Sequence, residues 1–408
     1  MIRKANVLLL LLLGLAALAG MVLVAYATAR GAGVGGDATI YLTSARNLIA
    51  GKGLGWTEAD GSFRLLPYSP PFYPLVLGIV GLLARNMLAG ARWLNVLLFG
   101  LTIALVGWFF FRATRRVWLA VVLSAVLAVS PVILGVQVWA MTESIFLLLG
   151  FAGLLALLAF LDRPRGWVLA LSALLTGLAF LTRYIGVAYV ATACLALLLF
   201  GSEDDRRIRL RWQNLRTAIL YGVAAIFPIL VWLVIDFSLT GTVGSRSGQP
   251  AAAYWQRFLE MGPALQQIYL FWLLPDSYIA RLPGLVKLAT WLVPLGLVAA
   301  LAVVLARRAS AAPRDTGVGK PAGASAVRLA GVFGLFVLVY LITLAIVQVF
   351  TYPPITLASR MLSPVHLAAL VLIFVLLHLS LNLLVPGSRA AVGLVYLGCF
   401  ALLGVYGL

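Results

Sequence analysis

Residues 35–74 read GGDATIYLTSARNLIAGKGLGWTEADGSFRLLPYSPPFYP, the longest polar interval near the start of an otherwise strongly apolar chain. From Asp37 onward, apolar residues recur at the three- and four-residue spacing of a helix, and a glycine follows at position 51. This pattern predicts a short amphipathic helix that begins at Asp37 and ends at Gly51. Such a helix lies in the membrane surface with its apolar face on the lipid. The carboxylate of Asp37 would then stand at the boundary between water and lipid.

The composition is that of a membrane protein. Of the 408 residues, 63% are hydrophobic and 10% are charged, which excludes a soluble globular domain. The formal net charge is +18, which in a soluble protein would suggest a nucleic-acid partner. Here most of the excess lies in short loops between apolar runs, so membrane topology explains it better and no nucleic-acid partner is expected.

Apolar runs of about spanning length are found at residues 7–27, 92–111, 117–134, 143–161, 167–182, 184–200, 217–236, 284–306, 327–349, 361–381 and 390–407. The first run follows Arg3 and Lys4 and looks like a signal peptide. It is longer than the apolar part of a signal peptide, so we expect a retained transmembrane helix. The sequence therefore predicts an all-α polytopic membrane protein of about 11 transmembrane helices, with interfacial helices in the first external loop.

Arginine and lysine gather in alternate loops, which decides the orientation of the chain. The basic loops lie at residues 3–4, 112–116, 163–165, 206–216 and 307–328, and the positive-inside rule makes them cytoplasmic. The N-terminus is then cytoplasmic, and residues 28–91 and 237–283 are the two long segments on the external face of the plasma membrane. We expect a functional site there.

This topology divides the chain into a membrane-embedded core, residues 1–306, a cytoplasmic linker, residues 307–326, and the last transmembrane helices, residues 327–408. In the external segment 237–283, a stretch of glycine and serine precedes an aromatic run from Tyr254 to Trp272. Aromatic residues at this level usually anchor helices at the membrane interface. A mobile flap over a lipid substrate is the alternative, and both interpretations stay open.

The first external loop has the order D-x3-Y-x3-A-x2-L-x2-G-x-G, followed by the motif Pro70-Pro71-Phe72-Tyr73-Pro74. Over residues 37–100 it resembles the polyprenyl-phosphate-dependent GT-C glycosyltransferases, the family of the dolichyl-phosphate-mannose protein mannosyltransferases and the bacterial lipid A aminoarabinose transferases. The resemblance implies a GT-C-like helix bundle, a polyprenyl-phosphate sugar donor, and Asp37 as the catalytic base. Relatives often carry Asp-Glu where this chain has Asp37-Ala38, which puts any role of a second acid, including metal binding, in doubt.

Transfer of a sugar from a sugar phosphate requires one base to take the acceptor's proton. The phosphate leaving group needs positive charge rather than a general acid. One acid with basic residues on the same side of the membrane is therefore a sufficient set. Asp37 suits the role of the acid, although an aspartate at this position also suits simple capping of the helix.

Glu143 lies at the predicted outer end of the fourth helix, where an acid that borders hydrocarbon is costly. It is a candidate for the substrate site, as the resemblance also implies. The alternative is that its negative charge only complements the first turn of its helix.

The external arginines are exceptions to the orientation rule. Arg183 lies between two apolar runs, and Arg360 begins the tenth helix. A guanidinium forms a planar fork that fits phosphate oxygens, so both are candidate phosphate ligands, whereas snorkelling to lipid headgroups is the alternative. The remaining candidates for substrate or phosphate binding are Tyr41, Arg64, Arg246 and Lys287.

The sequence thus predicts an inverting glycosyltransferase that moves a sugar from a polyprenyl-phosphate donor to a lipid, glycan or protein acceptor of the cell envelope. The alternative is a lipid or glycan transporter or flippase. Transporters usually show internal symmetry and ionisable residues in the middle of the membrane, whereas the polar residues of this chain gather at one face. Two cysteines and two histidines, all in apolar runs, offer no metal cluster, so no cofactor is expected.

The predicted topology is testable by labelling with a membrane-impermeant thiol reagent. A cysteine at Ser202 should react from the cytoplasmic side and a cysteine at Ser247 from the outside, because five arginines lie between residues 206 and 216. Cys194 and Cys399 are replaced by serine to remove the background. Labelling of both positions from one side would contradict the helix count and the placement of the site.

Overall fold

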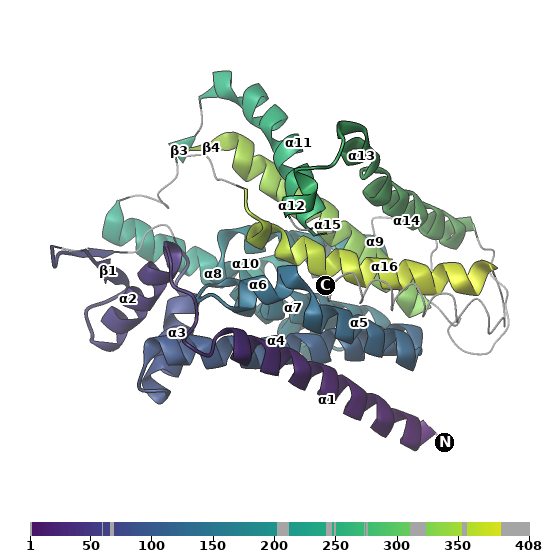
Figure 1. The fold of residues 1–408 in the computed structure, drawn as a ribbon, viewed down its shortest axis with the longest axis horizontal. Helices are drawn as coiled ribbons and strands as arrows, with labels where there is room; N and C mark the ends of the chain where they lie inside the picture. The colour runs from purple at the N-terminus through teal and green to yellow at the C-terminus, as the bar shows by residue number, and fades with distance from the viewer. Residues whose placement is uncertain are drawn as a thin grey trace.

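The computed structural model describes residues 2–58, 60–65, 69–201, 212–241, 247–248, 250–272, 274, 276–310, 324–352 and 357–384. Across these residues the chain forms an elongated bundle of helices (Figure 1). The predicted run at 390–407 and Arg246 lie outside the described residues, as do residues 311–323 of the predicted linker. Both ends of that predicted linker, residues 307–310 and 324–326, are helical.

Each apolar run that was predicted within the described residues forms helix, although the runs at 117–134 and 284–306 are each divided into two helices. Seven helices there are long and apolar enough to cross a membrane, or eight if the bent pair α5–α6 is one span, and α8 and α9 are shorter apolar helices. The bundle consists of α1 (Ile2–Ala27), α4 (Met87–Thr114), α5 (Val117–Val129), α6 (Pro131–Gln137), α7 (Glu143–Asp162), α8 (Gly166–Thr182), η1 (Tyr184–Gly186), α9 (Val187–Phe200), α10 (Trp212–Thr240), α13 (Gly284–Ala289), α14 (Leu292–Ser310), α15 (Ala324–Phe350), η3 (Ser359–Leu362) and α16 (Ser363–Leu384).

The run at 117–134, predicted as one continuous span, is broken. The chain bends by 55° between α5 and α6, and Ser130 at the break has the extended angles φ −60° and ψ 116°. The cause is Pro131, since the proline ring disfavours helical angles in the residue before it. Proline also suits the first turn of α6, where no intrahelical bond needs its missing N–H.

The first loop that was predicted to be external, residues 28–91, contains the helix that the sequence predicted. This helix, α2 (Asp37–Ile49), precedes an antiparallel hairpin of β1 (Gly55–Thr57) and β2 (Phe63–Leu65), and then α3 (Phe72–Leu83). The apolar face of α2 packs on α3 and α4 in one buried cluster, whereas the sequence analysis expected that face to lie on lipid. The helix is thus held by protein, which positions its first residue, Asp37.

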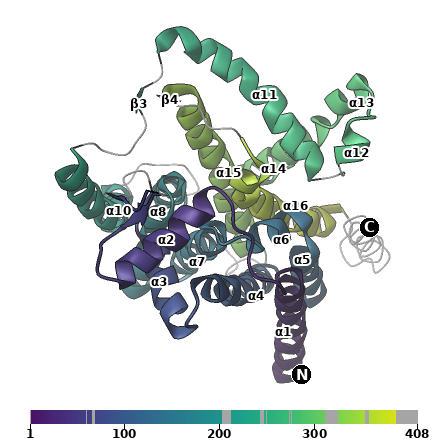
Figure 2. The same ribbon diagram turned by 60° about the vertical axis from the view of Figure 1, so that its left-hand side comes forward.

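The second external segment is more ordered than its sequence suggested. It contains β3 (Ser247–Gly248), η2 (Ala251–Ala253), α11 (Tyr254–Phe271) and α12 (Asp276–Ile279). The aromatic run therefore forms one helix of 18 residues. Strand β3 pairs with β4 (Thr351–Tyr352), which directly follows α15. Figure 2 shows α11 beginning near this pair and running along the edge of the bundle, beside α15, toward α12.

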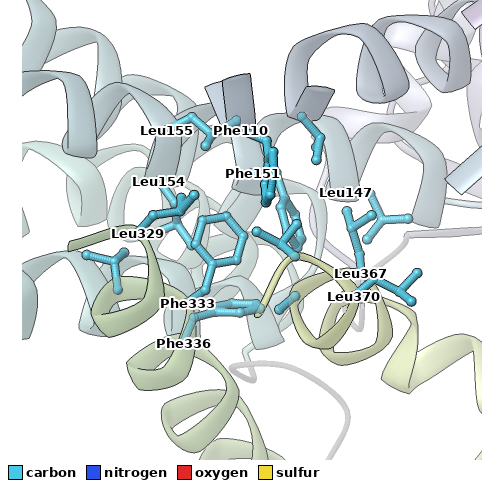
Figure 3. Close-up of a cluster of buried hydrophobic side chains, with 14 of the residues drawn as sticks. Phe110, Leu147, Phe151, Leu154, Leu155, Leu329, Phe333, Phe336, Leu367 and Leu370 are labelled. Carbon is cyan, nitrogen blue, oxygen red and sulfur yellow. The ribbon is translucent and has the colours of Figure 1, made fainter. Parts of the chain in front are cut away.

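Large aromatic side chains hold α7, α9 and α15 together, and Figure 3 shows those of α7 and α15. Phe151 lies 5.5 Å from Phe333 and 5.8 Å from Phe336 between ring centroids, and Tyr189 stacks on Phe336 at 4.6 Å. Lipid is as apolar as these rings, so their packing acts through van der Waals contact and shape rather than through the hydrophobic effect. At the far end of α7, Arg328 of α15 pairs with Asp162 at 2.9 Å.

A short backbone bridge joins the two loops that lead to the predicted acids. Gly33 donates from its backbone N–H to the carbonyl of Val138 at 2.7 Å, and its own carbonyl accepts from Ala140 at 2.9 Å. A side-chain carbon on Gly33 would lie 2.7 Å from the ring of Trp139. The close approach of these two segments therefore requires glycine at position 33.

Replacing Gly33 by alanine tests this bridge. The added methyl group must displace Trp139, and we expect a loss of about 1–3 kcal/mol in the free energy of unfolding, as for overpacked sites. Gly35→Ala is the matched control, since its side-chain carbon would meet the same ring at 3.6 Å, an ordinary contact. Unfolding of the purified protein in detergent measures both, and equal stability of the two variants would contradict the requirement.

Candidate active site

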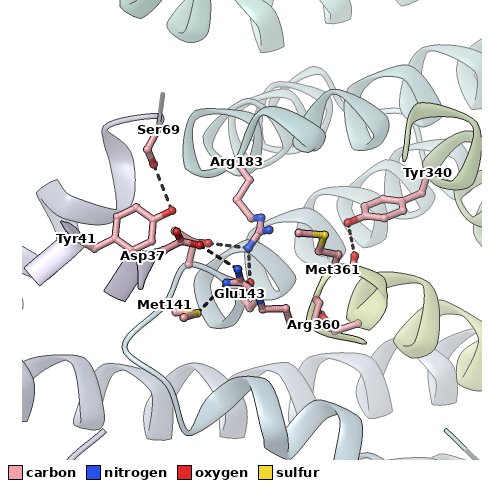
Figure 4. Close-up of polar contacts among 11 residues, drawn as sticks. Asp37, Tyr41, Ser69, Met141, Glu143, Arg183, Tyr340, Arg360 and Met361 are labelled. Atoms are coloured by element: carbon pink, nitrogen blue, oxygen red, sulfur yellow. Dashed lines mark hydrogen bonds and ion pairs between the residues drawn. The ribbon is translucent and has the colours of Figure 1, made fainter. Parts of the chain in front are cut away.

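Four charged side chains from distant parts of the sequence meet at one end of the bundle (Figure 4). They are Asp37, the first residue of α2, Glu143, the first residue of α7, Arg183, between α8 and η1, and Arg360 in η3. Each lies where a helix begins or ends, which places the four side chains at one end of the bundle. All four were predicted as site residues from the sequence, and the structure brings them together.

Glu143 lies at the centre of this group. Its side chain is 3% exposed, and its Oε1 atom accepts a hydrogen bond from Nη1 of Arg183. Nη1 of Arg360 lies 3.5 Å from the same oxygen. Arg183 also donates to the hydroxyl of Thr142 at 2.9 Å. Burial of a charge is costly unless it is paired, so the two guanidinium groups are what permits a buried carboxylate here.

Asp37 is the exposed acid of the group. Its side chain is 51% exposed, and its Oδ2 atom accepts from Nη2 of Arg360 at 3.0 Å. The N-cap residue of α2 is Gly36, and no side-chain hydrogen bond caps this helix. The carboxylate of Asp37 is therefore directed at Arg360 and away from the helix N–H groups that a capping aspartate would contact.

Two tyrosines of the first external loop border the charged group. Tyr41 lies one turn after Asp37, and its hydroxyl accepts from Ser69 at 3.4 Å. Its ring meets that of Tyr73 edge to face at 5.4 Å between centroids. Burial raises the pKa of the Tyr41 phenol, although the charge of Arg183 opposes this shift. The phenol is therefore neutral at physiological pH and acts as a hydrogen-bonding group.

Two residues that sequence reasoning missed hold the turn around Arg360. Tyr340, buried in α15, donates from its hydroxyl to the carbonyl of Met361 at 2.7 Å. Met141 places its sulfur 2.9 Å from Nη1 of Arg360. Tyr340 is a single hydroxyl within a long apolar run, and Met141 looks like an ordinary apolar residue. Neither residue type by itself points to a polar site in the sequence.

The other predicted residues lie elsewhere. Arg64 is on β2, where it pairs with Glu58 at 3.2 Å on the exposed hairpin. Lys287 is in α13, and its carbonyl accepts from Gln266 at 2.9 Å. Within the described residues, no contact joins Arg64 or Lys287 to the four charged residues. No group of three or more His, Cys, Asp or Glu side chains in this part of the chain is arranged to hold a metal ion.

Replacing Glu143 by glutamine tests the central carboxylate. The change leaves two guanidinium groups without their buried counter-charge, and we expect a loss of about 3–5 kcal/mol in the free energy of unfolding. Glu58→Gln is the matched control, because it breaks an exposed pair that should contribute less than about 1 kcal/mol. Unfolding in detergent compares the two, and a similar small loss for both would show that Glu143 is not the central counter-charge.

Comparison with sequence families gives a match over residues 68–232 to the family described as dolichyl-phosphate-mannose-protein mannosyltransferase. The matched region contains Glu143 and Arg183, whereas Asp37 and Arg360 lie outside it. Comparison with curated proteins gives no match.

Among solved structures, the chain is similar to ArnT from Cupriavidus metallidurans bound to undecaprenyl phosphate, with a TM-score of 0.54 and 17% identity over 89% of this chain and 59% of ArnT. It is also similar to the oligosaccharyltransferase AglB from Archaeoglobus fulgidus in complex with an inhibitory peptide and a dolichol-phosphate. There the TM-score is 0.53 and the identity 13%, over 98% of this chain and 55% of AglB. The chain thus spans less than two thirds of the length of either structure.

The family match and the structural similarity agree with the resemblance that was first seen in residues 37–100. The resemblance to the GT-C glycosyltransferases is therefore confirmed, and the chain is a multi-pass helical membrane protein with the GT-C fold.

Proposed function

We propose that the protein is an inverting glycosyltransferase that takes a sugar from a polyprenyl-phosphate donor at the external face of the plasma membrane. The observation that carries the proposal is the meeting of Asp37, Glu143, Arg183 and Arg360 at one end of the bundle. An exposed acid beside two arginines is the set that sugar transfer from a phosphate carrier requires. The carriers named for ArnT and AglB, undecaprenyl phosphate and dolichol-phosphate, support this class of donor.

Arg183 and Arg360 are the proposed phosphate ligands. When the bond between the anomeric carbon and the phosphate oxygen breaks, negative charge develops on that oxygen, and fixed guanidinium groups stabilise it. Each guanidinium has five N–H donors. Arg183 contacts Glu143, and Arg360 contacts Glu143 and Asp37, so both arginines keep N–H donors for a phosphate. Glu143 is too buried to reach the acceptor, and its proposed role is to hold both arginines in place.

Asp37 is the proposed general base. Arg360 contacts its Oδ2 atom, and a carboxylate has a second oxygen with acceptor capacity. That oxygen would take the proton from the acceptor's hydroxyl group while the hydroxyl oxygen attacks the anomeric carbon. The electron pair of the broken bond leaves with the polyprenyl phosphate, and the configuration at the anomeric carbon inverts. Pairing with Arg360 orients the carboxylate for this step.

Asp37→Asn tests this assignment. The amide keeps an oxygen for Arg360 but cannot take the proton, so we expect the transfer rate to fall by a factor of about 10² to 10⁴. Asp37→Glu keeps the carboxylate but displaces it, and should retain part of the activity. The assay is transfer of labelled sugar from a panel of polyprenyl-phosphate sugars in liposomes, with a thermal melt of each variant.

Asp60→Asn is the matched control, because Asp60 belongs to the same loop but its carboxylate accepts only locally, from the backbone N–H of Ser62 at 2.9 Å. This variant should transfer sugar at the wild-type rate. Near-normal turnover by a stable Asp37→Asn protein would refute the assignment of Asp37 as the base.

A further inference from the structure

The chain is contacted both before and after the turn that carries Arg360 by residues 247–248 and 250–272, which belong to the segment predicted to be external and which we name the external segment. Before the turn, β3 of this segment pairs with β4, so that Ser247 lies opposite Tyr352 and Gly248 opposite Thr351. Next to this pair, the ring of Tyr254 meets that of Phe350 at 4.7 Å between centroids. The beginning of the external segment is therefore attached to the end of α15.

The other end of the external segment is attached beyond the turn, to α16. Trp272 meets the ring of His366 edge to face, with 4.8 Å between centroids. His366 is 3% exposed, and its Nε2 atom lies 3.0 Å from the hydroxyl oxygen of Ser130. Ser130 is the residue at the bend between α5 and α6. Trp272 thus contacts a histidine that already joins α16 to the rest of the bundle.

The hydrogen bonds within the turn of Arg360 do not by themselves place this turn relative to Asp37 and Glu143, the acids that the Arg360 side chain contacts. The hydroxyl of Tyr340 binds the carbonyl of Met361, and the hydroxyl of Ser363 binds that of Arg360 at 2.8 Å. These bonds shape the turn from α15 and α16, the helices on either side of it. Asp37 and Glu143, which Arg360 reaches, belong to α2 and α7. The rings of Phe151, Phe333 and Phe336 join α7 to α15 well before the end of α15. The end of α15 and the first turns of α16 need contacts of their own.

We infer that the external segment positions Arg360 for the donor phosphate by joining the end of α15 to the first turns of α16, with Trp272 as a positioning residue that acts through His366. The identity of the ligand rests on the proposed function. Arg360 is 33% exposed, so a ligand can reach its guanidinium. A shift of its turn by about the length of one covalent bond is enough to lengthen a hydrogen bond from Arg360 to that ligand beyond the useful range.

A double-mutant cycle tests the inference. The measured quantity is the Kd of undecaprenyl phosphate, the carrier without a sugar, for the full-length protein in detergent. Trp272→Ala should weaken binding by about tenfold in the wild-type background and by less than about twofold in an Arg360→Lys background, because a positioning residue acts only through the group it positions. Trp272→Phe keeps a ring against His366 and should restore most of the affinity.

Trp255→Ala is the matched control. Trp255 lies in α11, which Trp272 directly follows, is 68% exposed, and stacks on Phe258 at 5.8 Å. Its removal should leave the Kd unchanged. If Trp272→Ala does not fold, as judged by a thermal melt, Tyr254→Ala replaces it in the same cycle with the same expected result, since Tyr254 makes the contact at the other end of the external segment.

The outcomes separate this inference from the proposed function. Equal losses of affinity in the wild-type and Arg360→Lys backgrounds, or an unchanged Kd in Trp272→Ala, would overturn the positioning role. A protein that gives the expected cycle but transfers no sugar would retain the positioning role and refute the transferase proposal. A wild-type protein that binds no undecaprenyl phosphate would overturn both.

Discussion

The arrangement of the site depends on one buried carboxylate between two guanidinium groups. Glu143 cannot be buried without a counter-charge, and its partners Arg183 and Arg360 come from a helix junction and from a turn near the end of the described chain. Bringing the three together joins α7, α8 and η3 at one end of the bundle. The apolar packing elsewhere is less selective, because van der Waals contact between apolar helices favours close approach but does not choose one polar partner over another.

The second acid is brought to this centre by backbone geometry. The bridge between Gly33 and the segment around Trp139 lies four residues before each acid, Asp37 and Glu143. One pair of hydrogen bonds therefore sets the position of α2 relative to α7, the helices that begin with these acids. The side chain of Asn95 holds the same segment by donating to the carbonyls of Gln137 and Trp139, at 2.9 and 2.7 Å. Two acids with different exposure result, one buried and structural, the other at the surface.

The four charged residues lie at places where helices break or begin. Arg183 interrupts the path from α8 to α9 with an extended backbone, and Arg360 lies in a short 3-10 turn. In a membrane, irregular backbone of this kind is tolerated where protein or a water-filled space satisfies its polar groups. The breaks therefore place the four charges together at one end of the bundle, as the proposed transfer of a sugar from a phosphate carrier requires.

The sequence by itself determined the helices and the candidate charges. The helix at Asp37 follows from local periodicity, the spans follow from uninterrupted apolar runs, and Glu143, Arg183 and Arg360 stood out because charge at the edge of hydrocarbon is costly. Only the tertiary structure decided that Asp37 pairs with Arg360, that Glu143 contacts both arginines, that Tyr340 binds the turn of Arg360, and that Trp272 contacts His366. The reason is physical: hydrophobicity and helical period act over a few residues, whereas the pairing of charges and rings depends on which distant helix ends the packed bundle brings within hydrogen-bonding distance.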